Sequence, residues 1–362
     1  PDPRGILRVV DARPREARVE QDRPGVVEAR RVGEVEIELG VGGEIRRRAG
    51  RAIRISQVAD KDVKKARSLV GKKALVTGDG FSLVRDKNID IVVELIGGYT
   101  VAKQLVLEAV RNGKHVVTAN KAVLATPGNE IFKAAQKAGV MVGFEASVAG
   151  GIPIIKAVRE GLAANRIEWI AGIINGISNF ILSEMRDKGL PFATALADAQ
   201  KRGYAEADPT FDIEGVDAAH KLTILSALAF GIPMQFRKAY VEGISRLTQE
   251  DIGYAEQLGY RIKLLGITKR TKQGIELRVH PTLIPTRRLI ANVEGVMNGI
   301  LVKGDAVGPT LYYGAGAGSQ PTASAVDADL IDVTRLITAD PEQRVPHLAF
   351  QPDQLSNEAI LG

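Results

Sequence analysis

Strand and helix patterns alternate regularly over residues 52–145, and few folds accommodate such a sequence. The clearest unit is an apolar run at 89–96, which is typical of a strand buried on both faces. Gly97-Gly98 ends this run, and an amphipathic helix pattern follows at 101–111. Strands and helices that alternate at this spacing predict βαβ units and a parallel sheet.

The same pattern recurs on both sides of this unit. Further strands are predicted at 53–60, 115–119 and 140–145, and further helices at 61–70 and 129–138. In an open parallel sheet the ligand binds beyond the carboxyl ends of the strands. The residues predicted at these ends are Asp60, Gly97, Gly98, Tyr99, Thr100, Asn120 and Lys121. We therefore expect a Rossmann-like α/β domain that binds a nucleotide over residues 1–150.

Residues 1–43 fit this domain poorly. Alternating apolar and charged residues at 35–39 predict a half-exposed strand, where a buried first strand is needed. Residues 40–43 supply the first two glycines of a G-x-G-x-x-G loop, but Ile45 stands at the third position. This stretch is either a phosphate loop or an incidental glycine-rich turn.

The second half of the chain mixes its elements differently. Helices are predicted at 153–162, 178–188, 193–201 and 216–230, and strands at 261–269, 275–280, 297–302 and 310–313. This order predicts an α+β domain over 151–320 that binds substrate and dimerises. A helix over 321–340 would return to the first domain, and 341–362 would be a linker that is cut short.

Composition excludes several classes of protein. The chain of 362 residues has no cysteine, so disulfides and thiolate catalysis are excluded, and a reducing cytoplasm is expected. Its 4 histidines are scattered singly, which argues against a zinc enzyme. No apolar run approaches the ~18–20 residues of a membrane span, and no signal peptide is visible. The net charge of +6 is dispersed and aromatics make up 5%, which argues against a nucleic-acid partner.

The most informative segment runs from Ala199 to Lys221. It holds several acidic residues and then Lys221, which lies four residues after Asp217 on a predicted helix, so both share one face. An ordinary surface ion pair would look the same. However, the helix continues as a strongly apolar sequence, which would shield the lysine from water and suit it to acid–base chemistry.

This segment resembles the signature of homoserine dehydrogenases. The matching residues are Ala199, Gly203, Tyr204, Asp208, Pro209, Asp212, Ile213, Gly215, Asp217 and Lys221. The resemblance extends from about Glu44 to the end of the chain. It implies hydride transfer between NAD(P) and L-homoserine or L-aspartate 4-semialdehyde, a step in threonine and methionine biosynthesis. It also implies that Lys221 donates the proton and that Glu206 and Asp217 bind the substrate.

Several other residues gain a role from the same resemblance. Matching motifs assign cofactor contacts to Lys121, Gly203, Gly318, Gly97 and Thr100. Asp60 suits ribose hydroxyls, which favours NAD, whereas the adjacent Lys61 suits a 2′-phosphate, which favours NADP. We expect either cofactor to be used, with a slight preference for NADP.

The resemblance also implies a structural sodium ion and a homodimer. The matching ion ligands would be the backbone carbonyls of Glu145, Val148, Gly150 and Ile152, because hard oxygen ligands suit a hard cation.

The chain departs from this family at both ends. Residues 1–43 lack the expected first strand and phosphate loop, which a frameshift, a gene-calling error or genuine divergence would explain. The first residue is not methionine. Many relatives carry a regulatory ACT domain after the linker at which this chain stops. Two alternatives therefore remain: a dimeric remnant without a working pyrophosphate loop, or a reductase of another amino-acid semialdehyde.

Overall fold

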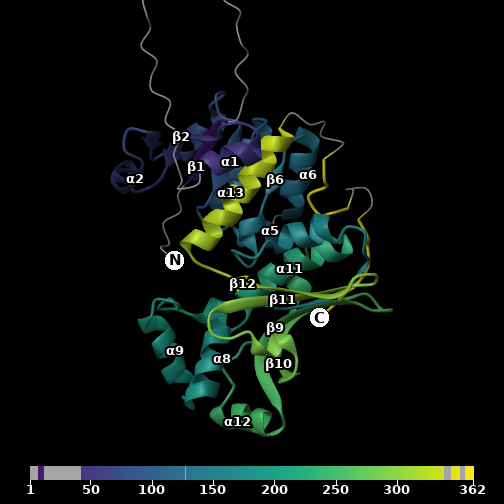
Figure 1. Cartoon of the computed structure of the whole chain (residues 1–362). Helices are drawn as coiled ribbons and strands as arrows, with labels where there is room; N and C mark the ends of the chain where they lie inside the picture. The colour runs from purple at the N-terminus through teal and green to yellow at the C-terminus, as the bar shows by residue number, and fades with distance from the viewer. Residues whose placement is uncertain (1–6, 12–41, 127, 338–343, 351–354) are drawn as a thin grey trace, which may run out of the picture.

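The computed structural model describes residues 7–11, 42–126, 128–337, 344–350 and 355–362, and they form two lobes (Figure 1). Each lobe is built around one sheet, and the helix α13 (Ser319–Leu336) lies across the upper lobe. The predicted strand at 35–39 and the start of the predicted loop, Gly40 and Val41, lie outside the described residues.

The first sheet has the strand order β3-β2-β1-β4-β5-β6. Its strands are β1 (Leu7–Asp11), β2 (Arg54–Ala59), β3 (Leu75–Thr77), β4 (Ile91–Glu94), β5 (His115–Thr118) and β6 (Val142–Gly143). The pairs β2–β3, β4–β5 and β5–β6 are parallel, and the order is that of a dinucleotide-binding fold.

The strand β1 corrects the expectation of a wholly parallel sheet. It fills the central position between β2 and β4, but it runs antiparallel to both. A gap at this position would leave unpaired backbone groups along β2 and β4, and the β-forming sequence Leu7–Asp11 satisfies them in this direction.

Helices cover both faces of this sheet. They are α1 (Gly42–Ala49), α2 (Val63–Val70), α3 (Gly80–Arg85), α4 (Thr100–Arg111), α5 (Lys121–Ala125), α6 (Gly128–Ala138) and α13. Alternate residues of β4 point to opposite faces: Val92 belongs to the cluster that includes α4 and α6, whereas Ile91 and Val93 pack with α13. Burial on both faces explains the continuous apolar run seen in the sequence.

The second sheet has seven strands in the order β12-β11-β7-β9-β10-β13, with β8 paired to β10. These strands are β7 (Ile167–Ile173), β8 (Tyr240–Val241), β9 (Tyr260–Arg270), β10 (Ile275–Pro285), β11 (Met297–Gly304), β12 (Gly308–Ala315) and β13 (Ile360–Leu361). The sequence did not predict β7, because the successive apolar residues Trp169, Ile170 and Ala171 obscure its alternation.

Helices pack on and around this sheet. They are α7 (Ile154–Lys156), which continues into a π-helical turn η2 (Ala157–Gly161), then α8 (Gly176–Lys188), α9 (Phe192–Lys201), α10 (Thr210–Ile213), α11 (Val216–Phe230) and α12 (Gln249–Gln257). Three short 3-10 turns complete the described elements: η1 (Glu145–Ser147), η3 (Phe236–Lys238) and η4 (Leu289–Asn292). The central helix is α11, which packs against β7, β9 and β10 and is almost wholly buried.

The C-terminal segment contacts both lobes. The Val142 N–H, on the edge strand β6, donates to His347 Nε2 at 3.1 Å, which satisfies a backbone group of the first sheet. The Ser356 N–H donates to the Gly231 carbonyl at the end of α11, and β13 pairs with β10. The residues predicted as a linker therefore cover parts of both lobes wherever the structure describes them.

Among the described residues, no helix has the length and apolarity needed to cross a membrane.

Candidate active site

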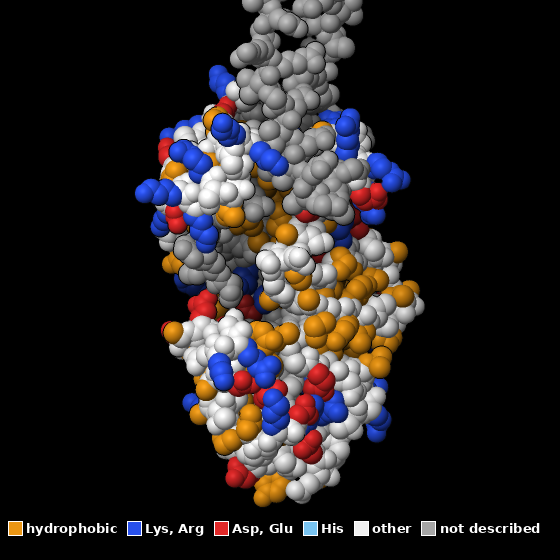
Figure 2. Space-filling view, turned by 60° about the vertical axis from the view of Figure 1, so that its left-hand side comes forward, with side chains coloured by type: hydrophobic (Ala, Val, Ile, Leu, Met, Phe, Trp, Pro, Cys, Tyr) orange, Lys and Arg blue, Asp and Glu red, His pale blue; other side chains and the backbone are white. Residues whose placement is uncertain are grey.

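A cavity of about 1180 Å³ lies between the two lobes. Its walls come from the carboxyl ends of β4 and β5, the turns around α9 and α10, the start of α11, the loop after β12 and one side of α13. Figure 2 shows the hollow between the lobes, with acidic and basic side chains inside it. The cavity also reaches Ile45 and Arg46 of α1, at the position where a nucleotide-binding fold holds its cofactor.

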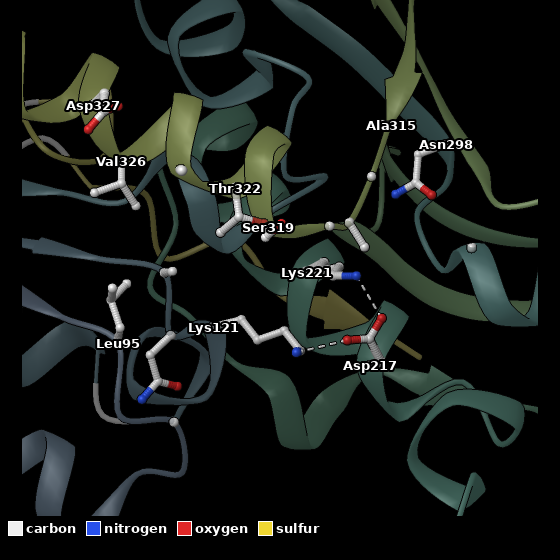
Figure 3. Close-up of a pocket in the computed structure, with 18 of the residues that line it drawn as sticks. Leu95, Lys121, Asp217, Lys221, Asn298, Ala315, Ser319, Thr322, Val326 and Asp327 are labelled. Carbon is white, nitrogen blue, oxygen red and sulfur yellow. Dashed lines mark hydrogen bonds and ion pairs between the residues drawn. The ribbon is translucent and has the colours of Figure 1, made fainter. Parts of the chain in front are cut away.

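An aspartate between two lysines forms the charged centre of this cavity. Lys221 Nζ lies 2.7 Å from Asp217 Oδ2, one helical turn away on α11, and it also donates to the Ile174 carbonyl at 2.8 Å. Lys121 Nζ, from the first lobe, lies 3.0 Å from Asp217 Oδ1. Figure 3 shows both lysines pointing toward this carboxylate from opposite lobes. The site is therefore assembled from both domains.

Burial and charge act on this carboxylate in opposite directions. Burial alone would raise the pKa of Asp217, but Lys221 and Lys121 outweigh it and hold the pKa well below its usual range. Burial likewise acts to lower the pKa of Lys121, and Asp217, with smaller contributions from Asp212 and Glu206, raises it overall. The aspartate and Lys121 therefore both stay charged near neutral pH.

Asp212 adds a further carboxylate to the same wall. Burial, and then repulsion from Asp217, raises its pKa. The Asn175 side-chain amide donates to Asp212 Oδ1 at 2.7 Å and to Asp217 Oδ2 at 2.9 Å, so it joins the two carboxylates. Neither Asp212 nor Asn175 was singled out from the sequence as a site residue.

A buried glutamate organises the loop that carries Lys121. Glu94, at the end of β4, accepts hydrogen bonds from Thr118 Oγ1 at 2.7 Å and from the Ile96 N–H at 2.7 Å. Asn120 donates to the Gly98 carbonyl at 2.6 Å, and its own Oδ1 caps the start of α5. Lys121 is the first residue of that helix, so these bonds determine where its side chain begins.

The turn after α9 brings Gly203 and Glu206 to the cavity. Gly203 adopts a φ of 73°, which lets the chain reverse directly after the helix. Tyr204 packs edge-on against Phe180 with ring centroids 5.2 Å apart, and Gln200 Nε2 donates to the Glu206 carbonyl at 3.0 Å.

The glycine-rich loop after β12 is packed too tightly at Gly316 to admit a side chain. A Cβ at Gly316 would lie 2.0 Å from the Asn298 amide, and one at Gly150 would lie 2.8 Å from the Gly316 carbonyl. The Gly151 N–H also donates to the Ala315 carbonyl at 2.9 Å. The turn at 145–152 therefore supports the loop that leads to Gly318 and the start of α13.

Seven of the ten residues predicted to contact substrate or cofactor meet in this cavity. Those that line it are Gly97, Lys121, Gly203, Glu206, Asp217, Lys221 and Gly318. Thr100, Asp60 and Lys61 follow the same strand ends but do not line it. The Asp60 carboxylate instead accepts the Asp62 N–H at 2.7 Å.

The predicted ion ligands lie behind the glycine-rich loop. The Glu145 carboxylate is already engaged by the N–H groups of Ile155 and Lys156, both at 2.9 Å. The ligands that the resemblance implies are the backbone carbonyls of Glu145, Val148, Gly150 and Ile152, and those of Glu145 and Ile152 already accept the N–H groups of Val148 at 3.4 Å and Ile154 at 2.7 Å.

Two lining asparagines received no role from the sequence. Asn175 begins a motif, residues 175–180, that resembles the family, but the contacts of its side chain depend on where β7 ends. Asn298 on β11 is 1% exposed, and its Oδ1 has no hydrogen-bond partner among the described residues. No local sequence pattern marks it, because its position depends on the pairing of β11 with β12.

The fold and the cavity define the class of protein. A dinucleotide-binding fold faces a second domain, and the cavity between them holds lysines and carboxylates suited to proton transfer and to binding an ammonium group. This is the arrangement of a two-domain NAD(P)-dependent oxidoreductase.

Comparison with known proteins gives the family. The family model described as homoserine dehydrogenase matches residues 153–331, and that described as homoserine dehydrogenase, NAD binding domain, matches residues 39–145. The chain belongs to the homoserine dehydrogenase family, whose members act in amino-acid biosynthesis. The function predicted from the sequence and the Rossmann-like fold are thereby confirmed.

Similar proteins come from several bacteria and an archaeon. The homoserine dehydrogenase of Pseudomonas aeruginosa is 65% identical over 318 residues, covering 88% of this chain and 73% of its own length. The crystal structure of a homoserine dehydrogenase from Thiobacillus denitrificans is 72% identical with a TM-score of 0.85, covering 88% of this chain and 74% of that one. A hyperthermophilic archaeal homoserine dehydrogenase in complex with NADPH is 27% identical with a TM-score of 0.65, covering 76% of this chain and 81% of that one.

Proposed function

We propose that Lys221 is the acid–base group that interconverts L-homoserine and L-aspartate 4-semialdehyde in this cavity. The observation that carries the proposal is that Lys221 lines the cavity and that its ammonium pairs with Asp217, which a second ion pair with Lys121 holds in place. The bound nicotinamide cofactor supplies or accepts the hydride. Lys221 Nζ donates a proton to the aldehyde oxygen during reduction and takes it back during oxidation.

Acidic residues suit the other end of the substrate. Homoserine and its semialdehyde carry an ammonium group, which carboxylates bind. Glu206 and Asp217 both line the cavity and are proposed to bind the amino group and the hydroxyl end of homoserine. Lys121 approaches from the first domain and is proposed to contact both substrate and cofactor.

The cofactor is NAD(P), and we propose that NADP is used slightly better than NAD. Gly97, Gly203 and Gly318 line the cavity and are proposed to contact the cofactor, as are Thr100 and the ribose-binding pair Asp60 and Lys61. If Lys61 meets a 2′-phosphate, Lys61→Ala should raise KM for NADP several-fold and leave KM for NAD almost unchanged.

The proposed role of Lys221 is tested by homoserine-dependent reduction of NADP at alkaline pH. Lys221→Ala should lower kcat by about 100-fold or more, because general acid–base catalysis contributes ~10²–10⁴-fold. Lys188→Ala is a matched control, since Lys188 also pairs with a carboxylate four residues away but lies half exposed. Near-normal turnover of Lys221→Ala would refute the assignment. A wild-type protein without activity and without NADP(H) binding in calorimetry would instead indicate a remnant.

We propose that the turn at 145–152 binds sodium through the carbonyls of Glu145, Val148, Gly150 and Ile152. Its support is the donor chemistry and the place of the turn behind the glycine-rich loop. Replacing sodium by N-methylglucamine at constant ionic strength should lower the thermal unfolding midpoint. An unchanged midpoint would count against the ion.

We propose that the protein is a homodimer formed through the second sheet. Ala171, Ile267 and Leu301 are half-buried neighbours across β7, β9 and β11. They lie on the face opposite α11, because the adjacent Thr268 points to that helix and hydrogen-bonds Ser226. Figure 2 shows hydrophobic side chains gathered on one flank of this lobe. Leu301→Glu should shift the mass measured by light scattering from dimer to monomer.

We also propose a cytoplasmic location, because a chain without cysteine forms no disulfides and so does not need an oxidising compartment. Fractionation of the native cell with antibody detection tests this.

A further inference from the structure

Asn175 occupies a junction between the second sheet and the charged centre. It follows β7 directly, lines the cavity and is 4% exposed. Its Oδ1 accepts the Ser178 N–H at 2.8 Å, so it caps the start of α8. Capping uses only the oxygen of the side chain, and the amide nitrogen remains for other partners.

That nitrogen serves two carboxylates at once. It donates to Asp212 Oδ1 at 2.7 Å and to Asp217 Oδ2 at 2.9 Å. An NH₂ group has two hydrogens, so each carboxylate receives its own. Two carboxylates that share one nitrogen at these distances repel each other, and the hydrogen bond from Asn175 acts to lower the pKa of both, beside the larger effects of Lys221 and Lys121 on Asp217.

Asn175 and the preceding residue, Ile174, also hold Lys221 in place. Asp217 Oδ2, which accepts from Asn175, lies 2.7 Å from Lys221 Nζ, and the neighbouring Ile174 carbonyl accepts from Lys221 Nζ at 2.8 Å. Lys221 is therefore held directly by a hydrogen bond to the Ile174 carbonyl, and indirectly by Asn175, which hydrogen-bonds the Asp217 carboxylate that pairs with the lysine. A rotation of the Asn175 amide would change the partner oxygen of the lysine.

We propose that Asn175 is a positioning residue of the reaction, whose amide nitrogen clamps Asp212 and Asp217 together and thereby orients Lys221 Nζ. This rests on the proposed function, in which Lys221 exchanges the proton. The cap and the clamp are separable by mutation. Asn175→Asp and Asn175→Ser both keep an oxygen that can cap α8, but neither retains the NH₂ group.

The test compares wild type, Asn175→Asp, Asn175→Ser and Asn175→Ala in homoserine oxidation, with thermal unfolding of each. For Asn175→Asp we expect kcat/KM for homoserine to fall by about 10- to 100-fold, since hydrogen bonds to charged groups are lost. KM for NADP should change little in Asn175→Asp and in Asn175→Ser, and the unfolding midpoint should change little in Asn175→Ser, because the cap survives there and no charge is added. Asn175→Ala should lose both activity and thermal stability.

The pH profile separates the clamp from a merely structural role. A third carboxylate beside Asp212 and Asp217 makes all of them harder to ionise, so the acid limb of the kcat/KM profile should move to higher pH in Asn175→Asp. Asn165→Asp is a charge-matched control, because the Asn165 oxygen also accepts a backbone N–H, that of Val307 at 2.9 Å, and Asn165 does not line the cavity. Its profile should match that of wild type.

Two outcomes would overturn the inference. Asn175→Asp with wild-type kcat/KM and an unmoved profile would leave Asn175 as a helix cap only. If that variant does not fold, a fully active Asn175→Ser would lead to the same conclusion. An inactive wild type is a separate result, which would reject the proposed function and this inference with it.

Discussion

The charge of Asp217 should stabilise the folded protein by an amount that depends on pH. Asp217→Asn keeps the shape of the side chain but removes the charge between Lys221 Nζ at 2.7 Å and Lys121 Nζ at 3.0 Å. Removing one partner of a buried ion pair costs ~3–5 kcal/mol. We expect about 3 kcal/mol, the lower end of that range, because the Lys121 side chain is 31% exposed and can turn toward water.

The pH dependence follows from the direction of the pKa shift. The folded-state pKa of Asp217 lies below the value of about 3.9 expected in the unfolded chain. Its contribution is therefore complete above pH ~4 and falls by about 1.4 kcal/mol for each pH unit below that, until the folded pKa is reached. The difference in unfolding free energy between wild type and Asp217→Asn should shrink accordingly.

Urea unfolding of both proteins at several pH values between 7 and 3 measures this difference. Asp198→Asn is the matched control: Asp198 pairs with Arg202 at the same four-residue spacing, but the Arg202 side chain is 45% exposed. It should unfold at nearly the wild-type urea concentration. The reasoning fails if Asp217→Asn is as stable as wild type at pH 7, or if the difference between them does not change in acid.

Two further predictions concern packing and acid stability. Gly316→Ala places a Cβ 2.0 Å from the Asn298 amide. This clash should weaken NADP binding, measured by calorimetry, by about 10-fold or more. In the control variant Gly253→Ala, on α12, the added Cβ meets nothing within 4 Å, so the stability of the protein should be unchanged or slightly higher. Burial, with smaller contributions from neighbouring arginines, lowers the pKa of His115 and His347 to about 4 in each case. Because the pKa of each histidine is lower in the folded protein than in the unfolded chain, the unfolded chain takes up these protons at a higher pH. The free energy of unfolding should therefore fall from pH ~6.5 toward pH ~4, and urea unfolding of His347→Gln should show a pH dependence smaller by up to about 1.4 kcal/mol per pH unit.

The sequence predicted the parts of the site that have fixed local spacing. Asp217 and Lys221 lie one helical turn apart, so a helix pattern alone places them on one face. Gly97 and Lys121 follow buried strands, whose apolar runs are recognisable because both faces are covered. These positions required no knowledge of tertiary contacts.

The sequence could not predict contacts between distant segments. Lys121 meets Asp217 only because the first domain docks above α11, and no periodicity encodes that docking. The strand β7 was missed, and with it the role of the Asn175 side chain. The central position of β1 and its antiparallel direction depend on pairing with β2 and β4, which a local pattern does not reveal.

The path of the C-terminal segment bears on how the two lobes can move. The chain passes from the upper lobe to the lower one before β7, returns through the loop before α13, and reaches the lower lobe again by Ser356. Any rotation of one lobe against the other must bend the crossings before β7 and before α13 together, while the C-terminal segment stays attached to both lobes through His347 and Ser356. Ligand-driven closure is therefore restricted to a hinge axis that passes near both crossings.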